Sequence, residues 1–177
     1  MWFNDRYRSR THRMVVMALL TALAVALSAF ERTIPLPIAL PGVKLGLANV
    51  VTLTSLFVLS LPDAALVVVL RVLLGSLLLG SFSAFLFSAA GAALSYVVMA
   101  WLKTKCSNVF SIVGISVAGA VAHNMGQLMA AAAVMQNLKI LSYLPFLLIA
   151  AVLTGIAIGF AVQAVLRPLT AALKHQR

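Results

Sequence analysis

Few side chains in this sequence can bind a ligand or carry out acid–base chemistry, and several of them interrupt long apolar segments. Arg71 lies inside one apolar run, and "GAVAHNMGQL" places His123 and Gln127 four residues apart with Asn124 beside them. A charge at the middle of a bilayer costs about 3 kcal/mol on insertion scales. Arg71 therefore has two interpretations: a cation that binds a ligand, or a structural group that pairs with helix carbonyls or Asp63.

The polar face around His123 also has two interpretations. Polar side chains grouped on one face of a spanning helix usually point into the helix bundle. They either form hydrogen bonds between helices or line a polar pocket. Metal binding is not indicated, because the sequence offers no second His or carboxylate at ligand spacing.

The stretch "ERTIPLPIALPGVKLGLANVVTL" is the most polar and irregular connection in the chain. Its three prolines cannot continue a helix, so they predict a stiff, extended loop that can act as a lid. Together with the side chains above, this stretch predicts a cationic, hydrogen-bonding group of residues that suits a small anionic or polar solute. The apolar surroundings, with Phe82, Phe85 and Phe87, would suit an aromatic or isoprenoid part of that solute. The candidate ligand-binding residues are Lys44, Asn49, Arg71, His123, Asn124 and Gln127.

Composition identifies the setting in which these residues act. The chain is 63% hydrophobic and 9% charged, whereas a soluble domain carries about 25% charged residues. We therefore expect an all-α integral membrane protein. The net charge of +10 comes from Lys and Arg residues near the ends of apolar segments, where they orient the chain in a bilayer, so nucleic-acid binding is not expected. Cys106 is the single cysteine and allows no internal disulfide.

Six apolar segments approach the length of about 20 residues that a helix needs to cross a bilayer. We expect a bundle of six transmembrane helices over residues 14–166, between a basic segment at 1–13 and a basic tail at 167–177. The first segment is read as a retained span, not a cleaved signal, because the chain stays apolar to its end. The six predicted spans are Met14–Phe30, Leu45–Leu61, Ala64–Leu79, Phe82–Leu102, Val109–Met135 and Tyr143–Leu166.

The distribution of basic residues predicts the orientation of the bundle. With six spans both termini share one side, and cytoplasmic segments carry the excess of Lys and Arg. Three basic residues, Arg32, Lys44 and Lys139, fall on the other side. We therefore expect both termini in the cytoplasm and the proline-rich loop outside. The basic residues on the side of the termini are Arg6, Arg8, Arg10, Arg13, Lys103, Lys105, Arg167, Lys174 and Arg177.

Small residues recur at four-residue spacing in the first and last predicted spans. Such residues let two helix backbones approach closely. Gly155 and Gly159 do so in the last span. The two interpretations are packing within this chain and docking of another membrane protein, and docking suits the first helix better because an edge helix is free to meet a partner. The candidate docking residues in the first span are Ala18, Ala22 and Ala26.

Several stretches resemble one bacterial family. "PGVKLGLANVVTL", "RVLLGSLLLGSFSAFLFSAAGA", "AHNMGQL", "YLP" and "TGIAIG" are similar to the Gx transporter family, also labelled heptaprenyl diphosphate synthase component I, from about Glu31 to Gly159. That family resembles the substrate-binding S components of energy-coupling factor transporters. The resemblance implies six helices with both termini inside and a ligand site under the loop between the first two helices. It also implies a first helix that docks on a transmembrane coupling subunit.

The resemblance leaves two functions open beside an unspecialised membrane scaffold. One is a solute-binding subunit of an importer in the bacterial cytoplasmic membrane, for a small micronutrient-like molecule, with ATP used by partner ATPase subunits and no cofactor in this chain. The other is a non-catalytic membrane component that assists a prenyl diphosphate synthase subunit. Asp5, Glu31 and Asp63 lie far apart in sequence, so the chain alone lacks the clustered oxygen ligands that Mg²⁺ requires. It also lacks a Gly-rich, Lys-containing ATP loop, and we do not expect an enzyme.

Overall fold

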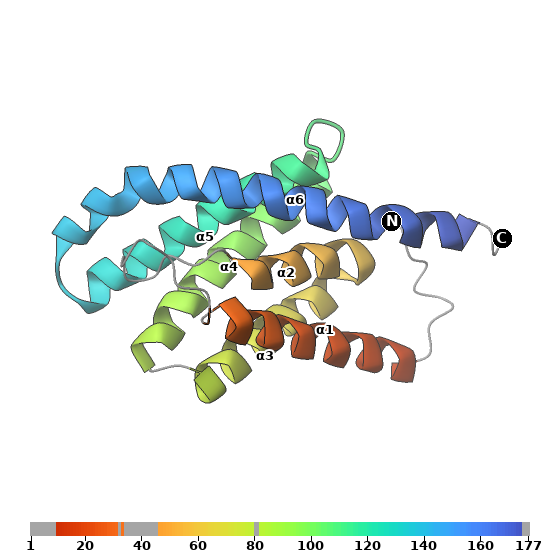
Figure 1. Ribbon diagram of the computed structural model, residues 1–177, viewed down its shortest axis with the longest axis horizontal. Helices are drawn as coiled ribbons and strands as arrows, with labels where there is room; N and C mark the ends of the chain where they lie inside the picture. The colour runs from red at the N-terminus through yellow and green to blue at the C-terminus, as the bar shows by residue number, and fades with distance from the viewer. Residues whose placement is uncertain (1–9, 32, 34–45, 80–81, 175–177) are drawn as a thin grey trace.

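The computed structural model describes residues 10–31, 33, 46–79 and 82–174, and this part of the chain is helical throughout (Figure 1). From α2 to α6 the helices follow each other along a bundle with short connections. The first residue of α1 and the last residue of α6 lie at the same end of this bundle. The elements in order are α1 (Arg10–Glu31), α2 (Leu47–Val58), α3 (Leu61–Leu79), α4 (Phe82–Lys105), α5 (Ile112–Val134), a 3₁₀ turn η2 (Leu138–Tyr143) and α6 (Leu144–Lys174).

Five of these helical stretches are long and apolar enough to cross a membrane: α1, α3, α4, α5 and the stretch that includes η2 and α6. The prediction of an all-helical, multi-pass membrane protein is therefore confirmed. The prediction of six full spans is wrong for α2, which has 12 residues. At 1.5 Å per residue α2 is about 18 Å long, whereas the hydrocarbon core is about 30 Å thick. That the shared end of the termini is cytoplasmic stays a prediction.

The turn after α2 explains why the predicted span Leu45–Leu61 is cut short. Leu59 leaves the helix in an extended conformation, and Leu61 already belongs to α3. The Ser60 hydroxyl donates to Asp63 Oδ2 at 2.7 Å and accepts from the Asp63 backbone N–H at 3.4 Å. Ser60 thus caps α3, and Pro62 falls in the first turn, where its missing N–H costs nothing.

The last helix is longer than expected. We expected the sixth span to close at Arg167-Pro168, but α6 continues to Lys174 with Pro168 inside it. Val162 and Leu166 are buried in the core and hold the preceding turn. A proline removes one backbone hydrogen bond and strains the helix, yet here it does not end it.

α2 is the most enclosed element of the bundle. It contacts α1, α3, α4 and α6, and Leu56 is fully buried. Its buried hydroxyls bond back to its own backbone, Thr52 to the Ala48 carbonyl and Ser55 to the Thr52 carbonyl, so no external partner is needed. A helix surrounded by protein does not have to match the thickness of the bilayer. The buried residues of α2 are Ala48, Asn49, Val51, Thr52, Leu53, Ser55, Leu56 and Val58.

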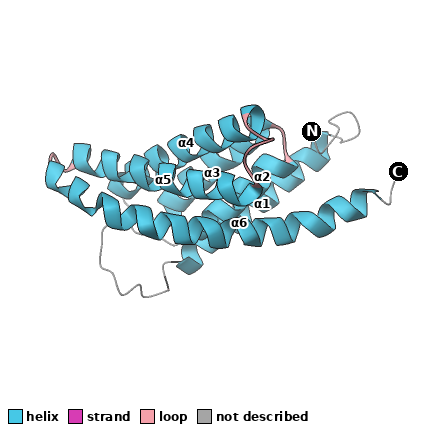
Figure 2. Ribbon diagram, turned by 90° about the horizontal axis from the view of Figure 1, so that it is seen from above, coloured by secondary structure: helices cyan, strands magenta, loops and turns pink. Residues whose placement is uncertain are grey.

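Small residues hold α5 and α6 close together, as Figure 2 shows from a second direction. A Cβ atom on Gly155 would lie 2.7 Å from Val117 Cα, and one on Gly159 would lie 2.7 Å from Val113 Cα. Real Cβ atoms do not approach a backbone so closely, so only glycine permits this contact. Of the two interpretations for Gly155 and Gly159, packing within the chain is confirmed.

The small residues of α1 behave differently. Ala18, Ala22 and Ala26 are exposed, whereas Thr21 and Ala24 are buried against the rest of the bundle. α1 packs on α2 and α3. Among the described residues, none buries the face of α1 that carries Ala18, Ala22 and Ala26.

Charged side chains tie the helices together at the end of the bundle where α1 begins. Arg13 Nη2 lies 2.6 Å from Asp63 Oδ2, which joins α1 to α3. Lys103 of α4 donates to the Leu56 carbonyl of α2 and lies 5.3 Å from the centroid of the Phe57 ring. Asp63 therefore pairs with Arg13, and its predicted alternative pairing with Arg71 is wrong.

We expect the Arg13–Asp63 pair to stabilise the fold modestly. The two side chains are 37% and 13% exposed, so water screens the pair and its coupling free energy is about 1 kcal/mol. A double-mutant cycle of Arg13→Gln and Asp63→Asn, with unfolding measured in detergent, checks this value. A coupling free energy near zero would contradict the role assigned to the pair.

Candidate functional site

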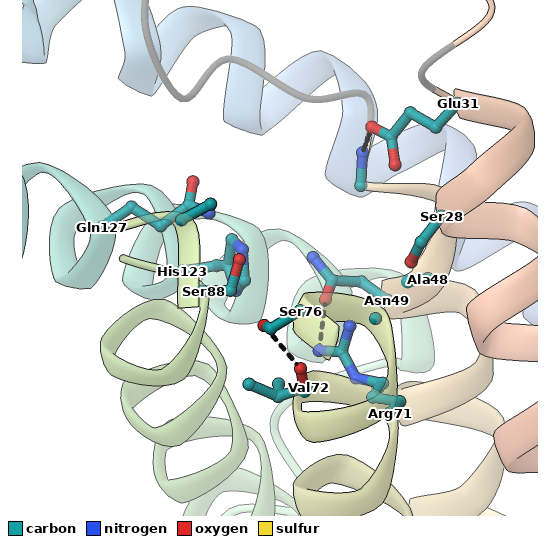
Figure 3. A pocket seen from close by; sticks show the side chains of 13 residues that line it. Ser28, Glu31, Ala48, Asn49, Arg71, Val72, Ser76, Ser88, His123 and Gln127 are labelled. Atoms are coloured by element: carbon teal, nitrogen blue, oxygen red, sulfur yellow. Dashed lines mark hydrogen bonds between the residues drawn. The ribbon is translucent and has the colours of Figure 1, made fainter. Parts of the chain in front are cut away.

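A polar cavity lies among five helices, α1 to α5, beside Glu31 and Gly46, which flank the proline-rich segment (Figure 3). Its water-accessible volume is about 60 Å³. A single water needs at least about 10–15 Å³, and typical small-molecule pockets measure about 300–1,000 Å³. The cavity thus has room for a compact polar group rather than for a whole vitamin-sized molecule.

Arg71 and Asn49 form the centre of this cavity. Arg71 Nη2 donates to Asn49 Oδ1 at 3.2 Å, which links α3 to α2. Arg71 Nε is buried and has no hydrogen-bond partner among the described residues. Buried polar groups in native structures nearly always have a partner, and an exception indicates a functional role, a water or a ligand. The guanidinium therefore keeps donor capacity for another group.

Glu31 brings an opposite charge to the same cavity. Its side chain is 6% exposed, and Glu31 Oε1 accepts from the Gly46 backbone N–H at 2.6 Å. Gly46 has φ 76° at the N-cap of α2, a left-handed conformation that favours glycine. The end of α1 is thereby joined to the start of α2, which carries Asn49. The cavity holds a carboxylate that was not among the expected binding residues.

His123 and Gln127 form the opposite wall, on the face of α5 that their four-residue spacing predicted. A Cβ atom on Gly91 of α4 would lie 2.6 Å from Gln127 Cγ and 2.8 Å from the His123 carbonyl oxygen. Only glycine lets α4 approach α5 here. Figure 3 shows Ser88 of α4 beside His123.

The structure therefore brings together four of the six expected binding residues, Asn49, Arg71, His123 and Gln127. Lys44 lies outside the described residues, as does the proline-rich loop. Their ligand-binding role stays a prediction.

Asn124 lies elsewhere. Its side-chain amide donates to the Leu147 carbonyl at 3.0 Å and joins α5 to α6. Asn124 lines a second cavity of about 160 Å³, together with Phe87 and Tyr143, and Gln127 lines both cavities. Asn124 thus contributes to helix packing beside the site, and the structure does not place it in the polar cavity.

Sequence reasoning missed three serines and one acid in the lining. Ser28 and Glu31 are three residues apart at the end of α1, and Ser76 and Ser88 come from α3 and α4. The expected aromatic surroundings are wrong for this cavity, since no phenylalanine lines it among the described residues. The spacing of Ser28 and Glu31 was a signal that could have been read, whereas single serines are common in spanning helices and carry little information.

Metal binding has no support in the described part of the chain. Within residues 10–31, 33, 46–79 and 82–174, no group of three or more His, Cys, Asp and Glu side chains is placed to hold an ion.

We expect Gly91→Ala to destabilise the protein, because the added methyl group collides with Gln127 and with backbone of α5. Overpacking of this kind typically costs about 1–3 kcal/mol. Gly75→Ala is a matched control, since a Cβ there meets nothing within 4 Å. Thermal unfolding of both variants in detergent provides the measurement. Equal midpoints for the two variants would show that the α4–α5 crossing is not as tight as described.

Comparison with family models identifies a family for this chain. Residues 20–165 match the family described as heptaprenyl diphosphate synthase component I. A search of curated proteins and a search of solved structures each found no match.

Proposed function

The chain belongs to the heptaprenyl diphosphate synthase component I family, and on this premise we propose that it is the substrate-binding membrane subunit of an energy-coupling factor type importer. Its solute is small and micronutrient-like and carries an anionic group that the cavity can hold. The observation that carries this proposal is the polar cavity around Arg71, enclosed by five helices of a multi-pass membrane protein.

The chemistry of Arg71 supports an anionic group in the solute. A guanidinium presents a planar fork of N–H donors that fits a carboxylate or phosphate. Asn49 takes one of these donors, and the buried Nε has no partner among the described residues. A solute acid can accept the remaining donors, while His123 and Gln127 offer further hydrogen bonds from the opposite wall.

The exposed alanine face of α1 supports a membrane partner. Ala18, Ala22 and Ala26 present small side chains on an edge helix, and small residues allow close helix–helix contact in a bilayer. We assign this face to a transmembrane coupling subunit. ATP hydrolysis belongs to separate partner subunits, in the bacterial cytoplasmic membrane.

The family description favours a second candidate function, a non-catalytic membrane component of heptaprenyl diphosphate synthesis. In that case the chain presents or accepts a lipid substrate for a synthase subunit. The two functions differ in their partners, so identification of the partners separates them.

We expect affinity capture of the tagged protein from mildly solubilised native membranes to recover a coupling subunit and ATPases. Ala22→Trp should abolish this recovery, because the large ring prevents close approach on α1. Ala157→Trp is the control, since Ala157 is equally an exposed alanine but lies on α6. Mass spectrometry of the captured proteins provides the measurement.

Recovery of a prenyl synthase subunit without ATPases would instead support the second function. Equal recovery of the coupling subunit with both tryptophan variants would show that the alanine face is not the docking surface.

We expect Arg71→Gln to remove the compound that the wild-type protein retains during purification. Hydrogen bonds to charged groups contribute about 1.5–3 kcal/mol, which corresponds to about 10- to 100-fold in affinity. Extraction of the purified protein and small-molecule mass spectrometry measure the retained compound. Lys139→Gln, at an exposed lysine in η2, should retain it in full. Full retention by a correctly folded Arg71→Gln variant would exclude Arg71 from the site.

A further inference from the structure

An apolar groove of about 340 Å³ lies between α3 and α4. Small side chains produce this hollow, because alanines occupy positions where larger residues would fill the space between the helices. Tyr96 is the one polar side chain among the described residues that line the groove, and its hydroxyl already donates to the Leu61 carbonyl at 2.6 Å. The groove can therefore hold only a hydrocarbon surface. The alanines that line it are Ala65, Ala89, Ala92 and Ala93.

The groove faces the bilayer. Val69, Leu73 and Val97 line it and are 52%, 41% and 60% exposed. They belong to two helices that are candidate membrane spans, so their exposed surfaces contact lipid chains rather than water. A molecule reaches this groove sideways from the membrane.

Val72 lies between the groove and the polar cavity, since it lines both. Its neighbours divide between the two spaces: Arg71 and Ser76 line the cavity, and Val68 lines the groove. Figure 3 shows Val72 beside Ser76 and Arg71.

The same division is found on α4. There Ser88 lines the cavity and Ala89 lines the groove. The contact between α3 and α4 is also less extensive than the contact between α4 and α5. The cavity and the groove therefore lie on the inner and outer sides of one loosely packed helix seam.

The two spaces differ in a way that fits a two-part ligand. The cavity is small and polar and contains the guanidinium of Arg71 together with Glu31, whose Oε1 already accepts from the Gly46 N–H. The groove is several times larger and apolar. A carboxylate or phosphate fills the first, and a hydrocarbon chain fills the second.

We propose that the solute of the polar cavity is an amphiphile, with an anionic head at Arg71 and a hydrocarbon tail in the α3–α4 groove, and that it enters from the bilayer through this seam. This inference rests on the proposed ligand-binding function and deepens it by naming the class of solute. A tail gains little by leaving lipid for an equally apolar groove. Affinity must therefore come from the head, and this requirement distinguishes a bound ligand from ordinary lipid that coats the surface.

Photolabelling in lipid nanodiscs tests the proposal. The probe is a long-chain fatty acid with a diazirine in mid-chain, and its methyl ester is the probe without an anionic head. We expect the acid to label peptides of α3 and α4 at groove residues at least fivefold more than the ester does. Arg71→Gln should reduce labelling by the acid to the level of the ester, and Lys139→Gln should leave it unchanged.

A second pair of variants tests the seam without touching Arg71. Val72→Phe enlarges the side chain at the boundary between groove and cavity, and it should reduce labelling by the acid to the level of the ester. Val152→Phe adds the same ring at an exposed position of α6 that lines neither the groove nor the cavity, and it should preserve the preference for the acid. This pair keeps the proposal testable if Arg71→Gln does not fold.

Equal labelling by acid and ester, or labelling that is insensitive to both Arg71→Gln and Val72→Phe, would overturn the proposal, because the groove would then hold only bulk lipid. Affinity capture separates this failure from failure of the proposed function. Head-dependent labelling without recovery of ATPases would support the amphiphile and reject the importer. Recovery of ATPases without head-dependent labelling would support the importer and reject the amphiphile.

Discussion

A guanidinium inside a membrane span must be surrounded by protein, and the arrangement of this bundle meets that requirement for Arg71. The enclosed helix α2 brings Asn49 to Arg71 at 3.2 Å, and the end of α1 brings Glu31 to the same cavity. α5 closes the opposite wall with His123 and Gln127. Five helices thus converge on the cavity that holds Arg71, a group that is expensive to expose to lipid.

The same requirement explains the two kinds of packing in the bundle. α4, α5 and α6 approach closely at glycines, as Gly91 and Gly159 show. α3 and α4 meet at alanines and leave a groove. Tight contacts hold Gln127 and His123 in place, while α3 and α4 leave a groove beside the cavity.

The helical, membrane-spanning character of the chain and one wall of the cavity could be predicted from the sequence, because both depend on local patterns of residues. Hydropathy and the scarcity of charge predict spanning helices, and the four-residue spacing of His123 and Gln127 predicts that they share a wall. The pairing of Asp63 with Arg13, fifty residues away in sequence, depends on how α1 packs against α3. The length of α2 depends on its burial by neighbours rather than on its own apolar run. Asn124 shares its neighbours' polarity, yet its position on the helix turns it toward α6. None of these three follows from a local pattern.

The shortness of α2 has a consequence for how the protein responds to its membrane. Helices that face lipid adjust to a thicker or thinner bilayer by tilting or by shifting along their axes, at a modest cost per ångström of hydrophobic mismatch. α1 and α3 are subject to this adjustment, because each is a candidate span. α2 is shielded from lipid by its neighbours and is too short to span the bilayer, so it is not subject to this adjustment. Bilayer thickness thus acts on Arg71 through α3 but not directly on Asn49, so we expect a change in lipid composition to alter the hydrogen bond between them.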